Sequence, residues 1–208
     1  MGKRLCVILI VIVCLVFCSC HNKNQSFDHD AVCAEITIED NILASGFFIN
    51  SKGDILTAAH SFSNLYQLFD ISICVNINGQ AYQAMLKSIN FDKDIALLST
   101  NISVSKFVDL GSGTGAKSKY AYVIGNAKEH KNTQTKVKVV YNNVMIETDT
   151  KSYLGAVFEG DIAQGLSGAP VFDNNGCFLG MVVGKGTKNK QIYALSLAEI
   201  NNFLIGDI

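Results

Sequence analysis

From residue 31 onward, the chain consists of short runs rich in Ile, Val, Phe and Tyr, separated by turns that contain Gly and Asn. In residues 71–77 isoleucine and valine alternate with Ser, Cys and Asn, which is the period-two pattern of a half-buried β-strand. The pair Asn78-Gly79 follows and predicts a tight type I′ turn into residues 80–86. No run has a helical period until the C-terminus, so the pattern predicts an all-β fold.

The predicted strands form two sets of about six. The first set contains the hairpin just described, a second hairpin of residues 45–49 and 55–58 around a turn at 50–54, and a buried strand at 95–98. The second set has a turn at Asn142-Asn143 and contains residues 120–124, 136–141, 144–148, 171–172, 177–183 and 191–195. Two sets of this size predict two six-stranded antiparallel β-barrels packed together.

The C-terminus is the one segment with a helical pattern. Ser196 is a typical N-cap residue, Glu199 follows three positions later, and apolar residues recur at helical spacing as far as Leu204. This pattern predicts a short C-terminal helix over residues 196–204.

The first twenty residues differ from the rest. A short basic start precedes an unbroken apolar run at 5–17, which is typical of an export signal and too short for a comfortable membrane span. Residues 17–20 also resemble a bacterial lipobox, in which Cys20 would be lipidated and would attach the protein to a membrane. Lipoprotein processing is the favoured interpretation, with ordinary cleavage and an uncleaved anchor as alternatives. Export predicts a periplasmic or cell-envelope location.

The composition shifts divide the chain into five parts. We predict a signal peptide at 1–20, a polar tether at 21–30, an N-terminal barrel at 31–110, a linker at 111–118, and a C-terminal barrel with the terminal helix at 119–208. The linker comes within one residue of a phosphate-binding loop, because Ala116 stands where that motif needs glycine. A strand rather than a helix is predicted to follow it, so a flexible connection is the better interpretation.

Charge and cysteine content restrict the classes of function. A net charge of -1 and a pI near 6.4 give no electrostatic reason to expect nucleic-acid binding. Outside the signal segment only Cys33, Cys74 and Cys177 remain, an odd and widely spaced set that allows at most one disulfide and fits no zinc motif. We therefore predict no metal and no cofactor. The sequence indicates nothing about the oligomeric state.

A serine flanked by glycines marks the candidate site. Ser167 lies between Gly165-Leu166 and Gly168, at a turn between hydrophobic runs. Glycine lets the backbone take unusual dihedral angles, so the amides of Gly165 and Ser167 can point together toward a developing oxyanion. Ser167 is the candidate nucleophile, and an ordinary loop is the alternative, because such turns also occur where there is no catalysis.

A serine hydroxyl needs a base, and the base needs an acceptor that fixes its tautomer. Of the four histidines, His60 alone ends an apolar strand, whereas the others lie in the tether or in a polar stretch. Taken alone, His60 would by default be a satisfied core histidine. Asp94 directly precedes the apolar run at 95–98, where a carboxylate that enters a core needs a partner. Asp92, two residues earlier, would face the other way and is predicted to be exposed.

These segments resemble the trypsin-like serine peptidases of the two-barrel chymotrypsin fold, nearest the bacterial HtrA/Deg-type branch. The resemblance rests on motifs at 45–60, 92–98, 123–126 and 165–170, which occur in the family's order of His, Asp, Ser. It implies that His60 is the general base, Asp94 its orienter and Ser167 the nucleophile, with the amides of Gly165 and Ser167 as the oxyanion hole. The implied partner is a protein or peptide substrate.

The sequence departs from this family at two positions. Leu166 replaces the Asn or Asp usual before the serine, and Ala169 replaces a glycine. Without a polar side chain at position 166, we expect an oxyanion hole that is less rigid or that forms only on substrate binding. No PDZ-type module follows the barrels, so we expect no regulation through one.

Two residues are candidates for substrate selection. By the resemblance, Asp161 lies near the base of the pocket for the side chain that precedes the scissile bond. A buried carboxylate there would select Lys or Arg; the alternative is a surface aspartate, as small apolar preferences in HtrA-type relatives suggest. Gly184 would leave the pocket wall open and offer backbone to an extended peptide.

The sequence as a whole predicts an exported serine endopeptidase. The alternative is a non-catalytic module that uses the trypsin-like fold to bind a peptide or partner, and the departure at Leu166 motivates it.

Overall fold

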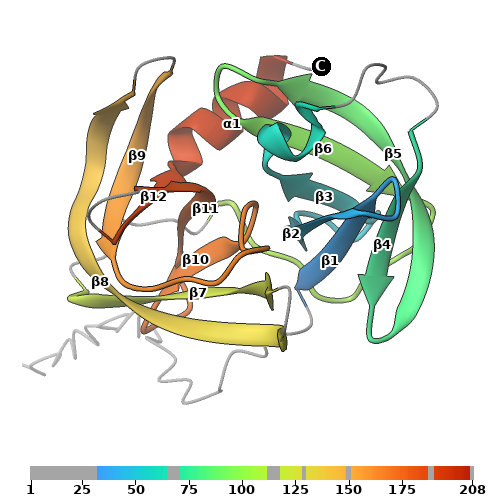
Figure 1. Ribbon diagram of the computed structural model, residues 1–208, viewed down its shortest axis with the longest axis horizontal. Coiled ribbons are helices and arrows are strands. Elements are labelled where there is room, and N and C mark those ends of the chain that lie inside the picture. The colour runs from blue at the N-terminus through green and yellow to red at the C-terminus, as the bar shows by residue number, and fades with distance from the viewer. Residues whose placement is uncertain are drawn as a thin grey trace, which may run out of the picture.

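The computed structural model describes residues 32–64, 71–111, 118–127, 130–148, 151–186 and 190–206. Two closed antiparallel barrels lie side by side, with the C-terminal barrel at the left of Figure 1 and the N-terminal barrel at the right. The predicted fold class is therefore confirmed. The predicted signal peptide with Cys20, the tether and most of the linker lie outside the described residues.

The N-terminal barrel has six strands in the order β1-β2-β3-β6-β5-β4. They are β1 (Cys33–Ile38), β2 (Ile42–Phe48), β3 (Asp54–Thr57), β4 (Ile73–Ile77), β5 (Gln80–Asn90) and β6 (Ile95–Thr100). The turn between β4 and β5 has positive φ at both Asn78 and Gly79, as a type I′ turn requires. Both predicted hairpins of this barrel are confirmed.

The C-terminal barrel repeats the same strand order in its own six strands. They are β7 (Tyr120–Ala127), β8 (His130–Glu147), β9 (Ser152–Glu159), β10 (Pro170–Asp173), β11 (Phe178–Lys185) and β12 (Gln191–Leu195). The helix α1 (Leu197–Gly206) follows and packs against β9 and β11. No helix of the described segments is long and apolar enough to cross a membrane.

The prediction of a turn at Asn142-Asn143 is wrong. Both residues lie within β8, one strand of 18 residues whose pairing with β9 shifts register around Tyr141 and Val144. Asn143 does take the left-handed conformation that asparagine tolerates, at φ 58°, but here it accompanies an irregularity and the strand continues. The remaining strand of this barrel, β9, was not predicted from the sequence pattern.

One hydrophobic cluster joins the two barrels. The ring of Phe47 on β2 lies 5.3 Å from the ring of Phe178 on β11, and Phe178 meets Phe172 on β10 edge-on at 6.0 Å. Each barrel also has its own buried cluster. Burial of this apolar surface fixes the junction between the barrels, where the candidate site lies.

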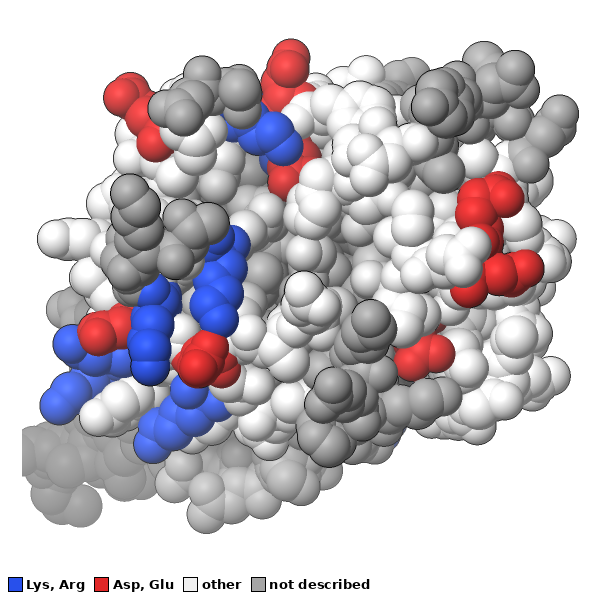
Figure 2. Space-filling view, in the orientation of Figure 1, with Lys and Arg blue, Asp and Glu red and all other residues white. Residues whose placement is uncertain are grey.

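Charged side chains lie almost entirely outside these clusters. On the face in Figure 2, basic side chains gather mainly over the C-terminal barrel, at the left, whereas acidic ones occur over both barrels. Among the described residues, Asp94 and Asp173 are the only buried charged ones. Asp173 is satisfied within its own turn, since it accepts the amides of Asn175 and Cys177. Asp94 has its hydrogen-bond and ion-pair partners in other segments of the chain, which makes it a candidate for a functional site.

Candidate active site

The N-terminal barrel places the predicted base, His60, beside its predicted orienter, Asp94. After β3 the chain enters the 3₁₀ turn η2 (Ala59–Phe62), which carries His60. Strand β3 pairs with β6, with Thr57 opposite Ala96, so the turn after β3 that carries His60 lies next to the residue just before β6. That residue is Asp94, which has φ 58°, a conformation that aspartate tolerates better than most side chains.

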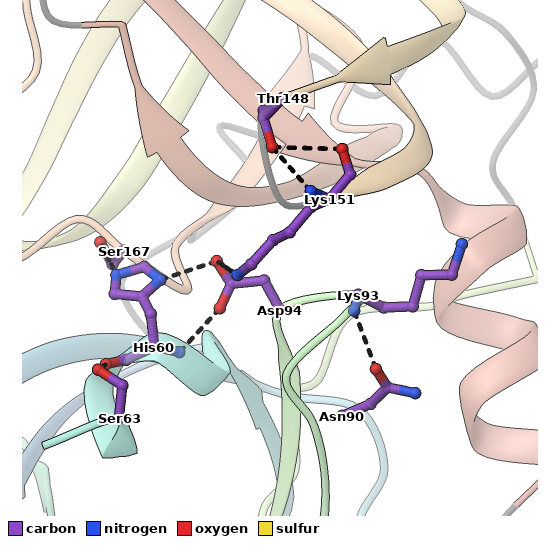
Figure 3. A network of polar contacts seen from close by, with 8 residues as sticks. All are labelled: His60, Ser63, Asn90, Lys93, Asp94, Thr148, Lys151 and Ser167. Atoms are coloured by element: carbon purple, nitrogen blue, oxygen red, sulfur yellow. Dashed lines mark hydrogen bonds and ion pairs between the residues drawn. The ribbon is translucent and has the colours of Figure 1, made fainter.

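The three predicted catalytic side chains form one hydrogen-bonded chain (Figure 3). The Nδ1 atom of His60 lies 2.9 Å from Asp94 Oδ2, and Nε2 lies 2.9 Å from Ser167 Oγ. The backbone amide of His60 also donates to Asp94 Oδ1 at 2.8 Å. An ionised Asp94 accepts only, so Nδ1 carries the proton and Nε2 is left to accept the proton of the serine hydroxyl.

Asp94 is held in its charged form. Burial acts to raise the pKa of Asp94, but the hydrogen bonds and charge of His60 and the charge of Lys151 outweigh it, so the pKa lies below its ordinary value. The carboxylate is therefore present at neutral pH to orient the imidazole.

The nucleophile turn of the C-terminal barrel is fixed by the N-terminal barrel. Ser45 on β2 donates its hydroxyl to the carbonyl of Gly165 at 2.7 Å and its amide to the carbonyl of Ser167 at 2.9 Å. Gly168 has φ 82°, and a Cβ atom there would lie 2.1 Å from the carbonyl oxygen of Ser45. Only glycine permits both this backbone conformation and this close approach between the barrels.

The two predicted oxyanion amides are available. Gly165 has φ 93°, in the region that favours glycine. Within the described part of the chain, the amides of Gly165 and Ser167 donate no hydrogen bond to protein groups. Leu166 between them is buried in the core cluster of the C-terminal barrel, so apolar packing and the two bonds from Ser45 support the turn where the polar brace is missing.

Asp161 does not lie in a buried pocket. Its side chain is 73% exposed, and its carboxylate pairs with Lys185 Nζ at 2.6 Å. The hydrogen bond and charge of Lys185 lower the pKa of Asp161. The interpretation of Asp161 as a buried selector for Lys or Arg is therefore wrong, because the carboxylate is solvated and already has a cation; the surface alternative describes it.

Gly184 lies where the pairing of β11 with β12 shifts register. A Cβ atom built at Gly184 would meet only Tyr193, at 4.0 Å, so the backbone is uncrowded here, and the role of Gly184 in substrate binding stays a prediction. The three cysteines Cys33, Cys74 and Cys177 form no disulfide with one another.

Two contact residues had no role in the sequence interpretation. Ser45 belongs to a segment that carries the family resemblance, but its function as a brace depends on the second barrel. Lys151 follows β8 in a polar stretch, and its Nζ lies 3.3 Å from Asp94 Oδ2. Nothing in the sequence distinguishes Lys151 from an ordinary surface lysine.

Two barrels with this strand order and a Ser-His-Asp constellation at their junction define the chymotrypsin-like class of fold. The chain belongs to the trypsin-like peptidase domain family, whose model matches residues 44–181, more than half of the sequence. The predicted family is thus confirmed. A search of curated protein sequences returned no match.

Solved structures share the fold at low sequence identity. The Rv3671c protease from M. tuberculosis, in its active form, is 17% identical, with a TM-score of 0.74 over 85% of this chain and 81% of that chain. Deg5 is 20% identical, with a TM-score of 0.70 over 83% and 87%. The MamO protease domain from Magnetospirillum magneticum is 15% identical, with a TM-score of 0.68 over 83% and 95%.

Proposed function

We propose that the protein is an exported serine endopeptidase that hydrolyses peptide bonds in protein substrates through a Ser-His-Asp acyl-enzyme mechanism. One observation carries the proposal: His60 lies between Ser167 Oγ and Asp94 Oδ2 with 2.9 Å on each side. An imidazole held this way can take the serine proton while its own positive charge is stabilised.

The mechanism follows from these contacts. Ser167 Oγ attacks the substrate carbonyl carbon while its proton passes to His60 Nε2, and the amides of Gly165 and Ser167 bind the resulting oxyanion. The tetrahedral adduct collapses as His60 gives the proton to the leaving amine, which leaves an ester on Ser167. Water then attacks this ester, again with His60 as base, and its collapse releases the acid and restores the hydroxyl.

A Ser167→Ala variant tests the proposal directly. We expect the native protein to degrade casein and to be labelled on Ser167 by an active-site serine phosphonate, and the variant to do neither. Ser51→Ala is a matched control, because Ser51 is an exposed serine in the turn between β2 and β3 and makes no contact to His60, Asp94 or Ser167. Equal cleavage of casein by the native protein and the Ser167→Ala variant would refute the peptidase.

The alternative is a non-catalytic module that binds a peptide or partner in the cleft. Its motivation was the loss of a polar brace at Leu166. The burial of Leu166 and the bonds from Ser45 to the turn favour the peptidase instead, because they support the two amides without that brace. Tight peptide binding with no labelling of Ser167 at any pH would favour the module.

The surface near Ser167 supports an extended, weakly charged substrate. A hollow beside the turn is lined by Asn41, Leu43, Gln164 and Gly165, none of which is charged. The carboxylate of Asp161 already forms an ion pair with Lys185. We therefore propose a preference other than Lys or Arg before the scissile bond.

Export and lipidation are proposed from the sequence. The apolar run at 5–17 and the lipobox-like residues 17–20 support a precursor lipidated at Cys20 and held at the cell envelope. Incorporation of a palmitate analogue in cells tests this. It should be lost in Cys20→Ala and kept in the matched Cys18→Ala variant, and labelling that persists in Cys20→Ala would refute the anchor.

A further inference from the structure

Lys151 reaches the orienting carboxylate from the opposite barrel. Its Nζ atom lies 3.3 Å from Asp94 Oδ2, the same oxygen that faces His60 Nδ1 at 2.9 Å. In Figure 3 the lysine side chain extends from the end of the hairpin between β8 and β9 down to Asp94. Asp94 Oδ2 therefore contacts both the imidazole of His60 and the ammonium of Lys151. Of these two groups, only His60 takes part in proton transfer in the proposed mechanism.

The backbone around Lys151 is fixed on both sides. Before β9, the amide of Thr148 donates to the carbonyl of Lys151 at 2.8 Å, and the amide of Lys151 donates to Thr148 Oγ1 at 3.0 Å. After Lys151, the carbonyl of Ser152 accepts Lys93 Nζ at 3.2 Å. Because Lys93 is the chain neighbour of Asp94, this bond ties the hairpin to the segment that carries the orienter.

The C-terminal helix completes this anchorage. Glu199 on α1 accepts Lys93 Nζ at 3.2 Å and the amide of Leu154 on β9 at 2.9 Å with the same carboxylate oxygen. Ser196 still caps the helix through the amide of Glu199. Glu199 thus serves the hairpin with its side chain, and the approach of Lys151 to Asp94 is a built feature of the barrel junction.

The surroundings of Asp94 make the lysine charge effective. The Asp94 side chain is 5% exposed and that of Lys151 27%, so water screens the pair less than a surface ion pair. The buried phenol of Tyr153 on β9 also faces Asp94. Burial, with the charges of Asp94 and Tyr193, raises the pKa of Tyr153 to about 12, so this neighbour is neutral. The charged groups around the carboxylate are therefore His60 and Lys151.

We propose that Lys151 is a positioning residue of the catalytic centre, whose ammonium fixes Asp94 and sets the pH at which His60 becomes available as a base. The inference rests on the proposed function. While His60 is neutral, Lys151 supplies the positive charge that offsets the burial of the carboxylate. When His60 takes up a proton, the imidazolium must share Asp94 Oδ2 with the ammonium, which disfavours the protonated ring.

The sign of the effect follows from this competition. Removing the lysine charge leaves Asp94 to His60 alone, so the imidazolium persists to higher pH. The acidic limb of the activity profile should then move upward by about one pH unit, the size typical of losing one nearby charge. Activity near pH 6 should fall several-fold relative to activity at pH 9.

The experiment measures the rate of Ser167 labelling by a serine phosphonate from pH 5 to pH 10 in the full chain. Lys151→Met and Lys151→Gln remove the charge and should move the acidic limb up, whereas Lys151→Arg should keep it near the native position. Lys138→Met is the matched control, because Lys138 on β8 of the same hairpin pairs with the exposed Glu159. Overlapping profiles for the native protein and both neutral variants would overturn the proposal.

A second measurement separates this inference from the proposed function. The imidazole of His60, assigned by comparison with His60→Gln, is titrated by NMR in the native protein and in the folded neutral variants. A midpoint that moves upward supports the role of Lys151 even if no protein reacts with the phosphonate, an outcome that would defeat only the peptidase. An unchanged midpoint in both neutral variants refutes the role of Lys151 while labelling of Ser167 leaves the peptidase intact.

Discussion

The two barrels have the same strand order but present their functional groups differently. In the N-terminal barrel, His60 follows the third strand within three residues and Asp94 precedes the sixth, so the β3–β6 pairing brings base and orienter together. In the C-terminal barrel, the third and fourth strands are separated by residues 160–169, and this loop carries Ser167. The residue before the sixth strand is Lys190, which has φ 48°, close to the 58° of Asp94.

This difference determines what holds each group. His60 and Asp94 are brought together by strand pairing within one barrel, and Lys151 then reaches Asp94 from the other barrel. The nucleophile turn is fixed by contacts between barrels, through Ser45 and the close approach of Gly168. The pairing of His60 with Asp94 is therefore an internal property of its barrel, whereas the contacts that hold the Ser167 turn require the barrels to be packed together.

The largest expected effect comes from breaking the pairing of His60 with Asp94 in the N-terminal barrel. Asp94→Asn keeps the shape but replaces an acceptor by a donor or a neutral oxygen, so His60 loses its fixed tautomer and the charge that stabilises its protonated form. We expect kcat to fall by about 10⁴-fold on a casein-derived peptide. Asp92→Asn, at an exposed acid two residues away, should leave kcat unchanged. A loss below tenfold in Asp94→Asn would mean that Asp94 is not the orienter.

A smaller effect is expected from breaking the contact between barrels. Ser45→Ala removes the bond to the Gly165 carbonyl and leaves that group and the amide of Asn126 without the serine hydroxyl. The cost should be about 1–3 kcal/mol, seen partly in unfolding by urea and partly as a decrease in kcat of roughly tenfold. If Ser45→Ala lowers stability but leaves kcat at the native level, Ser45 supports the junction without shaping the oxyanion hole.

The smallest effect is expected at the exposed acid of the C-terminal barrel. An exposed ion pair contributes little, so Asp161→Asn should change the ratio of kcat/KM for peptides with Lys or Ala before the scissile bond by less than about fivefold. Peptide cleavage assays with the two substrates check this. A tenfold or greater loss of Lys preference would restore Asp161 as a specificity residue.

The same comparison explains which parts of the fold and of the site could be predicted from the sequence. The hairpins of the N-terminal barrel were predictable because their apolar alternation and the Asn78-Gly79 turn are local signals. His60, Asp94 and Ser167 could be chosen because each stands where an apolar run meets a residue type that needs a partner. The distances of 2.9 Å between them confirm that the fold brings the three together.

The predictions that were wrong or missing concern residues whose structure depends on contacts with residues distant in the sequence. Asn142-Asn143 has the composition of a turn, but β9 pairs with β8 on both sides of it, from Lys138 to Glu147, and keeps it one strand. Asp161 has a position suited to a pocket, and only the fold reveals Lys185 beside it. Lys151 and Ser45 are ordinary surface and strand residues by sequence, and their roles arise from contacts across the barrel junction.

The dependence of the Ser167 turn on Ser45 has a consequence for biosynthesis. A ribosome releases the N-terminal barrel first, and that barrel closes through its own six strands. The serine emerges later and acquires its final geometry only when its turn docks on the finished barrel. If the proposed function holds, we expect proteolytic competence to be the last property that the growing chain attains.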